Sequence, residues 1–156
     1  FIPQTYCGDK VGKKSAQILK RPDIIGDGDP LDVCILTEKD IAHSDILLYA
    51  KPIGGFRMID GGEADDKIIA VLKGDQAYGE INDLSEMPKL VIDRVRHFFL
   101  TYKDLDGAAK NVEITHVYGK EEAFEVIKRA SNDYNTKYGD VNENLVEALL
   151  NAVSVK

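Results

Sequence analysis

Short apolar segments rich in β-branched residues follow one another from Leu31 onward, with turn residues between them. They cover residues 31–36, 45–53, 55–59 and 67–73, and residues 112–117 have the same character. Segments of this length and composition are typical of β-strands. Consecutive short strands favour an antiparallel sheet whose edges must be paired or covered. The pattern therefore predicts a small barrel or a strongly curled sheet.

Helical periodicity appears only after Pro88. Two sets of residues recur at spacings of three or four, which places each set on one face of a helix. The sets are Val91, Val95, Phe98 and Tyr102, and then Ala123, Ile127, Ala130 and Tyr134. We expect the second helix to end near Gly139 and a short last helix to follow. Without a repeat or a break in composition, the prediction is one α+β domain covering residues 1–156.

Residues 6–26 mix Gly8, Gly12, Pro22 and Gly26 with scattered lysines. Such a mixture fits neither the strand nor the helix pattern. The prediction is a long surface loop without an assigned function.

The charge balance limits the partners of this chain. With 27 acidic and 20 basic side chains, its net charge is -7, which argues against binding to nucleic acid or to an anionic membrane. Its apolar runs fall far short of the roughly 20 residues that cross a bilayer. Two cysteines are too few for a disulfide framework, and a reducing cytoplasm is the expected location.

An acidic segment precedes the first predicted strand, because residues 26–32 read Gly-Asp-Gly-Asp-Pro-Leu-Asp. Pro30 biases Asp29 toward an extended backbone, in which Asp27 and Asp29 project to the same side. Converging carboxylates repel one another unless a cation offsets their charge, and oxygen ligands favour Mg²⁺, Mn²⁺ or Ca²⁺. The segment is equally typical of an acidic turn that faces solvent.

A second acidic group occupies the turn before Lys67 and consists of Asp60, Glu63, Asp65 and Asp66. If both groups lie at the same end of the sheet, their carboxylates can hold several ions, as multi-metal sites for phosphoryl chemistry do. A polar hairpin loop is the other interpretation.

The chain resembles the soluble family I inorganic pyrophosphatases in several motifs that occur in the family order. They are Phe1–Thr5, Asp27–Val33, Met58–Lys67, His97–Phe99 and Tyr102–Leu105. The resemblance implies a small closed antiparallel β-barrel of the oligonucleotide-binding type with flanking helices, in the α+β class. It also implies hydrolysis of pyrophosphate to two phosphates by metal-activated water.

The resemblance further implies a role for eight residues. Asp27, Asp32 and Asp65 hold metal, Asp60 holds further metal in the catalytic complex, and Asp29 accepts a proton from the attacking water. Lys67, Tyr102 and Lys103 contact the phosphates. Taken alone, the last three fit a solvent-facing strand residue, a member of the apolar stripe and a cation near a helix end.

The same resemblance implies several Mg²⁺ ions as cofactors, with Mn²⁺ as a substitute. Pyrophosphate is the expected partner, together with further copies of the chain in a homo-oligomer. Two departures accompany these expectations. The connection over residues 6–26 is longer than usual, and we expect the amino-terminal part of the barrel, which in the family supplies further binding residues, to be missing.

Two alternative functions stay open at this point. The first is a non-catalytic barrel-type binding module, which should interleave basic and aromatic residues along its strands. The second is a calcium-binding structural domain, which needs no proton acceptor such as Asp29.

Overall fold

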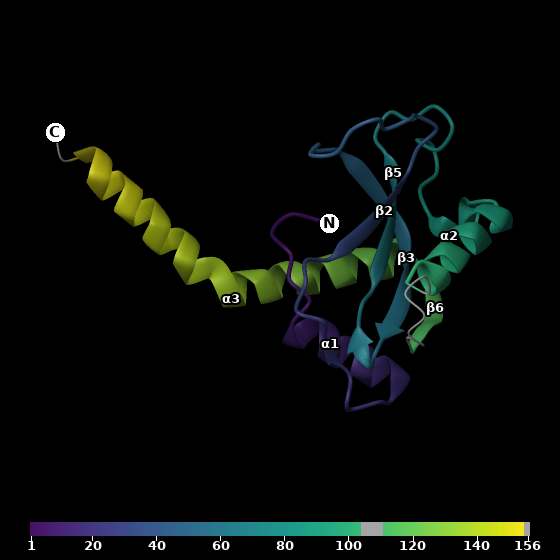
Figure 1. Ribbon diagram of the computed structural model, residues 1–156, viewed down its shortest axis with the longest axis horizontal. Helices are drawn as coiled ribbons and strands as arrows, with labels where there is room; N and C mark the ends of the chain where they lie inside the picture. The colour runs from purple at the N-terminus through teal and green to yellow at the C-terminus, as the bar shows by residue number, and fades with distance from the viewer. Residues whose placement is uncertain (104–110, 155–156) are drawn as a thin grey trace.

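The computed structural model describes residues 1–103 and 111–154, with side chains described as far as residue 139. In this part of the chain, six strands form one sheet with helices around it (Figure 1). The strands are β1 (Ile25–Gly26), β2 (Asp32–Leu36), β3 (Ala50–Asp60), β4 (Glu63–Ala64), β5 (Lys67–Leu72) and β6 (Val112–Gly119). The helices are α1 (Asp9–Leu19), α2 (Lys89–Thr101) and α3 (Lys120–Ser154), with a 3-10 turn over Leu84–Glu86.

Most predicted elements are found close to their predicted positions. Segments 45–53 and 55–59 join into the single strand β3, which begins only at Ala50. The expected helix end near Gly139 is wrong, because α3 runs through this residue to Ser154. A glycine weakens a helix by about 1 kcal/mol but does not break it.

The pairing of the strands differs from a simple antiparallel meander. β3 pairs antiparallel with β4, β5 and β6, whereas β2 pairs parallel with β5 and β1 parallel with β4. The prediction of only antiparallel neighbours is wrong because β5 lies between the consecutive strands β2 and β3. The described strands follow the order β1-β4-β3-β5-β2 with β6 added to β3, and they form a curled half-barrel.

Residues 6–26 are not a loop, because they contain α1. The buried face of α1 consists of Val11, Gly12 and Ser15, with Ala16 and Leu19 packed beside them. These positions have helical spacing. Gly12, Ser15 and Ala16 are small, however, and Gly12 is also typical of a turn, so only Val11 and Leu19 mark the stripe as apolar.

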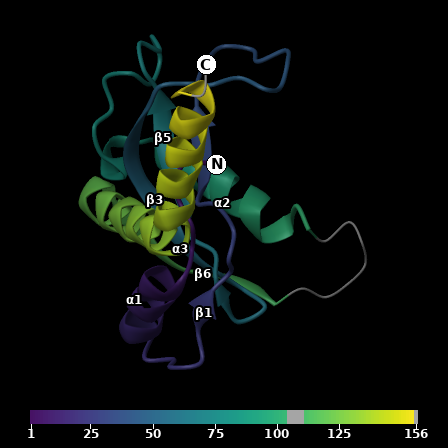
Figure 2. The same ribbon diagram turned by 90° about the vertical axis from the view of Figure 1, so that its left-hand side faces the viewer.

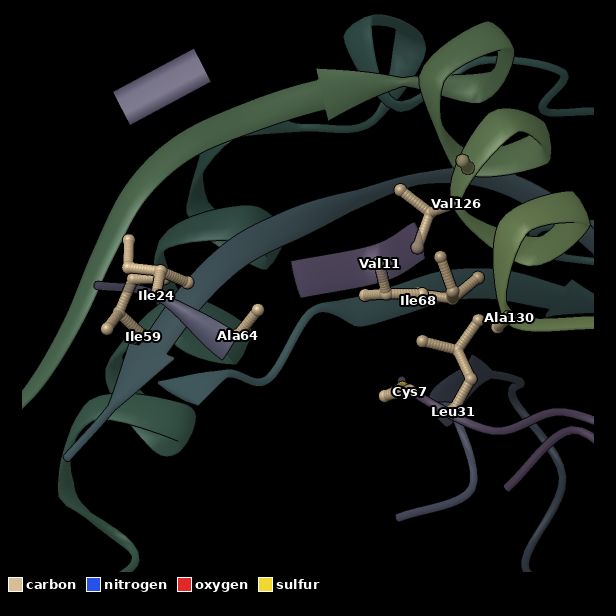
Figure 3. Packing of buried hydrophobic residues seen from close by; sticks show 10 residues of the cluster. Cys7, Val11, Ile24, Leu31, Ile59, Ala64, Ile68, Val126 and Ala130 are labelled. Atoms are coloured by element: carbon tan, nitrogen blue, oxygen red, sulfur yellow. The ribbon is translucent and has the colours of Figure 1, made fainter. Parts of the chain in front are cut away.

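Two apolar clusters lie on opposite sides of the sheet. On one side, α1 and α3 cover Ile59, Ala64 and Ile68, and Figure 3 shows Val11 and Val126 close to Ile68. On the other side, α2 packs beside a cluster that includes Phe56, Met58 and Ile69, and Figure 2 shows α2 and α3 on different sides of the strands. None of the described helices is both long and apolar enough to cross a lipid bilayer.

Candidate active site

The parallel pairing of β2 with β5 brings the two acidic segments together. Asp32, the first residue of β2, lies in register with Lys67, the first residue of β5. Asp65 lies two residues before β5, and Asp60 ends the neighbouring strand β3. The ends of three strands therefore carry these side chains to one place. This is the condition under which the two acidic segments can form a shared site.

Lys67 is at the centre of this group although it is only 2% exposed. Its Nζ donates to Asp32 Oδ2 at 2.6 Å and also to Asp65 Oδ1. Burial alone would lower the pKa of this ammonium, but the bonds to Asp32 and Asp65 raise it overall. Lys67 is therefore a buried cation held by two carboxylates, and not a solvent-facing strand residue.

A second lysine, just after the end of α2, binds the same cluster of aspartates. Lys103 Nζ donates to Asp60 Oδ2 and lies 4.0 Å from Asp65 Oδ2. Tyr102 is partly exposed and stacks on Phe98, with 5.2 Å between the ring centroids. The ring of Phe99 lies 6.0 Å from Lys67 Nζ, so the end of α2 borders the site with aromatic side chains.

The Asp27–Asp29 segment is bent and not extended as predicted. Gly28 has a φ of +79°, a conformation that side chains disfavour. The Asp29 N–H donates to Asp27 Oδ1 at 3.0 Å, which closes a local turn. Asp29 is consequently exposed. Burial raises the pKa of Asp27 to about 7 and the nearby charge of Asp65 adds to this, although the bond from Asp29 opposes the shift.

The donor set is suited to hard cations. Asp27, Asp32, Asp60 and Asp65 offer only carboxylate oxygens, and the two lysines show that this cluster stabilises positive charge. The repulsion between Asp27 and Asp65 is of the kind that a bound cation relieves. Among the described side chains, however, no three carboxylate, histidine or cysteine groups are gathered as a ready-made metal site. Lys67 joins Asp32 to Asp65, Lys103 joins Asp60 to Asp65, and Asp27 faces Asp65 directly.

Sequence reasoning missed a buried ionic group behind the site. Asp66 and Arg57 are 1% and 3% exposed. Tyr118 donates its O–H to Asp66 Oδ2 at 3.0 Å, and Arg57 Nη2 lies 3.7 Å from the same oxygen and 2.7 Å from Glu122 Oε1. Burial raises the pKa of Asp66 to about 7, against the opposing effects of Arg57 and Tyr118. The sequence offered one signal for this group, because an arginine within the apolar run 55–59 indicates a buried charge that needs an acidic partner.

Comparison with known proteins gives one consistent result. Residues 1–135 match the sequence model of the family described as inorganic pyrophosphatase. The inorganic pyrophosphatase of Chlamydia caviae is 51% identical over 143 residues, covering 88% of this chain and 66% of that protein. That of Picrophilus torridus is 38% identical over 134 residues, covering 86% of this chain and 64% of that protein. The chain thus spans about two thirds of the length of these relatives.

Solved structures agree with the sequence matches. An inorganic pyrophosphatase from Neisseria gonorrhoeae aligns with a TM-score of 0.67 and 34% identity, over 86% of this chain and 67% of that one. A protein from Anaplasma phagocytophilum titled inorganic phosphatase aligns with a TM-score of 0.68 and 30% identity, over 86% and 68%. These likenesses confirm the predicted α+β fold of the oligonucleotide-binding type.

Proposed function

The chain belongs to the inorganic pyrophosphatase family, and from this we propose that it hydrolyses inorganic pyrophosphate to two phosphates at the carboxylate cluster around Lys67. Members of this family are metal-dependent. The observation that carries the proposal is the buried Lys67, which bonds to Asp32 and Asp65 from separate segments. The family match gives no support to a binding module or to a structural calcium domain.

The lysines are suited to bind the phosphates. Lys67 and Lys103 carry positive charge, and a phosphate oxygen accepts a charge-assisted bond from an ammonium. Both are paired with aspartates that would hold divalent cations, so cation binding frees the lysines to contact substrate. Tyr102, next to Lys103, offers a phenolic donor to charge that develops on the leaving phosphate.

We assign Asp27, Asp32, Asp60 and Asp65 as the ligands of Mg²⁺, with Mn²⁺ as a substitute. When bound, such ions neutralise the phosphates and ionise a water molecule near neutral pH. Asp29 is exposed and joined through its own N–H to Asp27. In this proposal the Asp29 carboxylate, next in the chain to the ligand Asp27, accepts the proton of the attacking water.

The wider setting is part of the same proposal. We expect a homo-oligomer with pyrophosphate as its substrate, and neither nucleic acid nor a membrane as a partner. Cys7 and Cys34 are free thiols, which agrees with a reducing cytoplasm as the location.

The test is release of phosphate from pyrophosphate by the purified protein, with Mg²⁺ present or absent. The protein should be active only with the cation, and Lys67→Met should lose most of the activity. Glu63→Ala serves as the control, because Glu63 is an exposed acidic residue of β4, four positions before Lys67. A wild-type protein that releases no phosphate with either Mg²⁺ or Mn²⁺ would refute the proposal.

A further inference from the structure

Helix α1 lies directly against the segment that carries Asp27 and Asp29. We propose that α1 positions this segment, and that Gly12 and Asp133 are the two positioning residues through which it does so. The effect of α1 on hydrolysis rests on the proposed function, whereas its effect on Mg²⁺ affinity can be measured without any hydrolysis. Figures 1 and 2 show α1 beside α3, and Figure 2 also shows it beside β1.

The first contact joins the backbone of α1 to the backbone of β1. A Cβ added to Gly12 would lie 2.4 Å from Gly26 N and 2.7 Å from the carbonyl carbon of Ile25. Backbone atoms cannot rotate away as the end of a flexible side chain can. Gly26 immediately precedes Asp27, so the distance between α1 and β1 fixes where the acidic segment begins.

The second contact holds the amino terminus of α1. Gly8 at the helix start offers no side chain as a cap, and Asp133 of α3 accepts bonds from Lys10 N at 2.9 Å and Val11 N at 3.2 Å. Asp133 is only 5% exposed. A carboxylate at this position satisfies donors that the helix leaves unpaired and is favoured by the helix dipole. Asp133 therefore fixes α1 relative to α3.

The acidic segment is also bonded to the residues that lead into α1. Cys7 N donates to Asp29 O at 2.8 Å, and Gly28 N donates to Cys7 O at 2.9 Å. Cys7, before α1, thus bonds to the Asp27–Asp29 segment itself, and Gly12 of α1 packs on Ile25 and Gly26 just before it. A displacement of the helix reaches the acidic segment through both contacts.

Gly12→Ala tests the first contact. The new methyl group forces α1 and β1 apart by about 1 Å, a scale at which site geometry can cost up to about 10²-fold. We expect the dissociation constant of Mg²⁺, measured by titration calorimetry, to rise at least tenfold. The Mg²⁺ concentration for half-maximal hydrolysis should rise in parallel. Gly139→Ala is the matched control, because an added Cβ in α3 meets nothing within 4 Å.

Asp133→Ala tests the second contact and should weaken Mg²⁺ binding in the same direction. Asp133→Asn keeps one oxygen that accepts an N–H bond, so it should restore part of the affinity. A purely structural role would lower the unfolding temperature of the Asp133 variants without this graded change in Mg²⁺ affinity. If Gly12→Ala fails to fold cooperatively by circular dichroism, the Asp133 series decides the question.

The two proposals can fail separately. Absence of hydrolysis by the wild-type protein refutes the proposed function, while calorimetry still tests the role of α1. Wild-type Mg²⁺ affinity in folded Gly12→Ala or in Asp133→Ala would overturn the positioning role, and so would an equal loss in Gly139→Ala.

Discussion

Asp66→Ala should destabilise the folded protein because it removes the buried partner of Arg57. Removing one member of a buried ion pair costs about 3–5 kcal/mol when the other charge is left alone. Here Arg57 keeps Glu122 at 2.7 Å, so the lower end of that range applies. Tyr118 also loses the acceptor of its O–H, which adds to the cost.

Part of this cost is offset because Asp66→Ala also removes the unfavourable burial of the Asp66 carboxylate. That burial raises the pKa of Asp66 to about 7. We therefore expect a net loss of about 3 kcal/mol in the free energy of unfolding. For a chain of 156 residues, this corresponds to a fall of roughly 6–12 °C in the unfolding temperature. Urea unfolding at pH 8 with EDTA measures the loss without a contribution from cations at Asp65.

Two further variants identify the cause. Tyr118→Phe removes only the hydroxyl and should cost about 1 kcal/mol. Arg57→Met introduced into Asp66→Ala should make the protein more stable than Asp66→Ala alone, because it removes a buried guanidinium that Glu122 alone pairs only in part. If Asp66→Ala lies within about 0.5 kcal/mol of the wild type, the range of ordinary surface substitutions, the ionic group does not stabilise the fold.

Three other outcomes are expected. Asp29→Asn should lower turnover by about 10²- to 10⁴-fold while Mg²⁺ affinity is retained, as for loss of a general base, and near-normal turnover would exclude that role. Asp32→Ala and Asp65→Ala should each raise the Mg²⁺ concentration needed for activity, which exposed Glu63→Ala should leave unchanged. The hydroxyl of Thr37, helped by three backbone N–H groups, holds the pKa of Asp75 below its usual value. The stability from this lowered pKa is present above about pH 4 and lost as the pH falls further, so urea midpoints should drop less steeply with acid in Asp75→Asn.

Local patterns in the sequence predicted the elements whose side chains repeat with a clear period. Val91 and Val95 mark α2 in this way, and the β-branched run before Leu72 marks β5. The same reasoning missed α1, whose buried face has Gly12 and Ser15 beside the single larger residue Val11. Close backbone packing selects small residues, and small residues carry little periodic signal.

The candidate site was predictable in composition but not in geometry. Carboxylates crowded before Leu31 and again before Lys67 indicated cation chemistry. Their meeting depends on the parallel pairing of β2 with β5, which joins segments distant in sequence and leaves no local pattern. The bonds that Asp133 accepts from the α1 backbone are a tertiary feature of the same kind.

The start of β5 belongs to both the candidate site and the core. Side chains alternate along a strand, so Asp65 and Lys67 face the carboxylate cluster while Asp66 and Ile68 face α1 and α3. Lys67 stays buried and charged only while Asp32 and Asp65 are held beside it. The backbone at Asp65 is held in turn by the next residue, Asp66, through its contacts with Tyr118 and Arg57. Substitutions on the α3 side should therefore change the affinity of the site without touching a ligand. Under the proposed function the reverse also follows, because cations bound at Asp65 would stabilise the strand on which Ile68 packs.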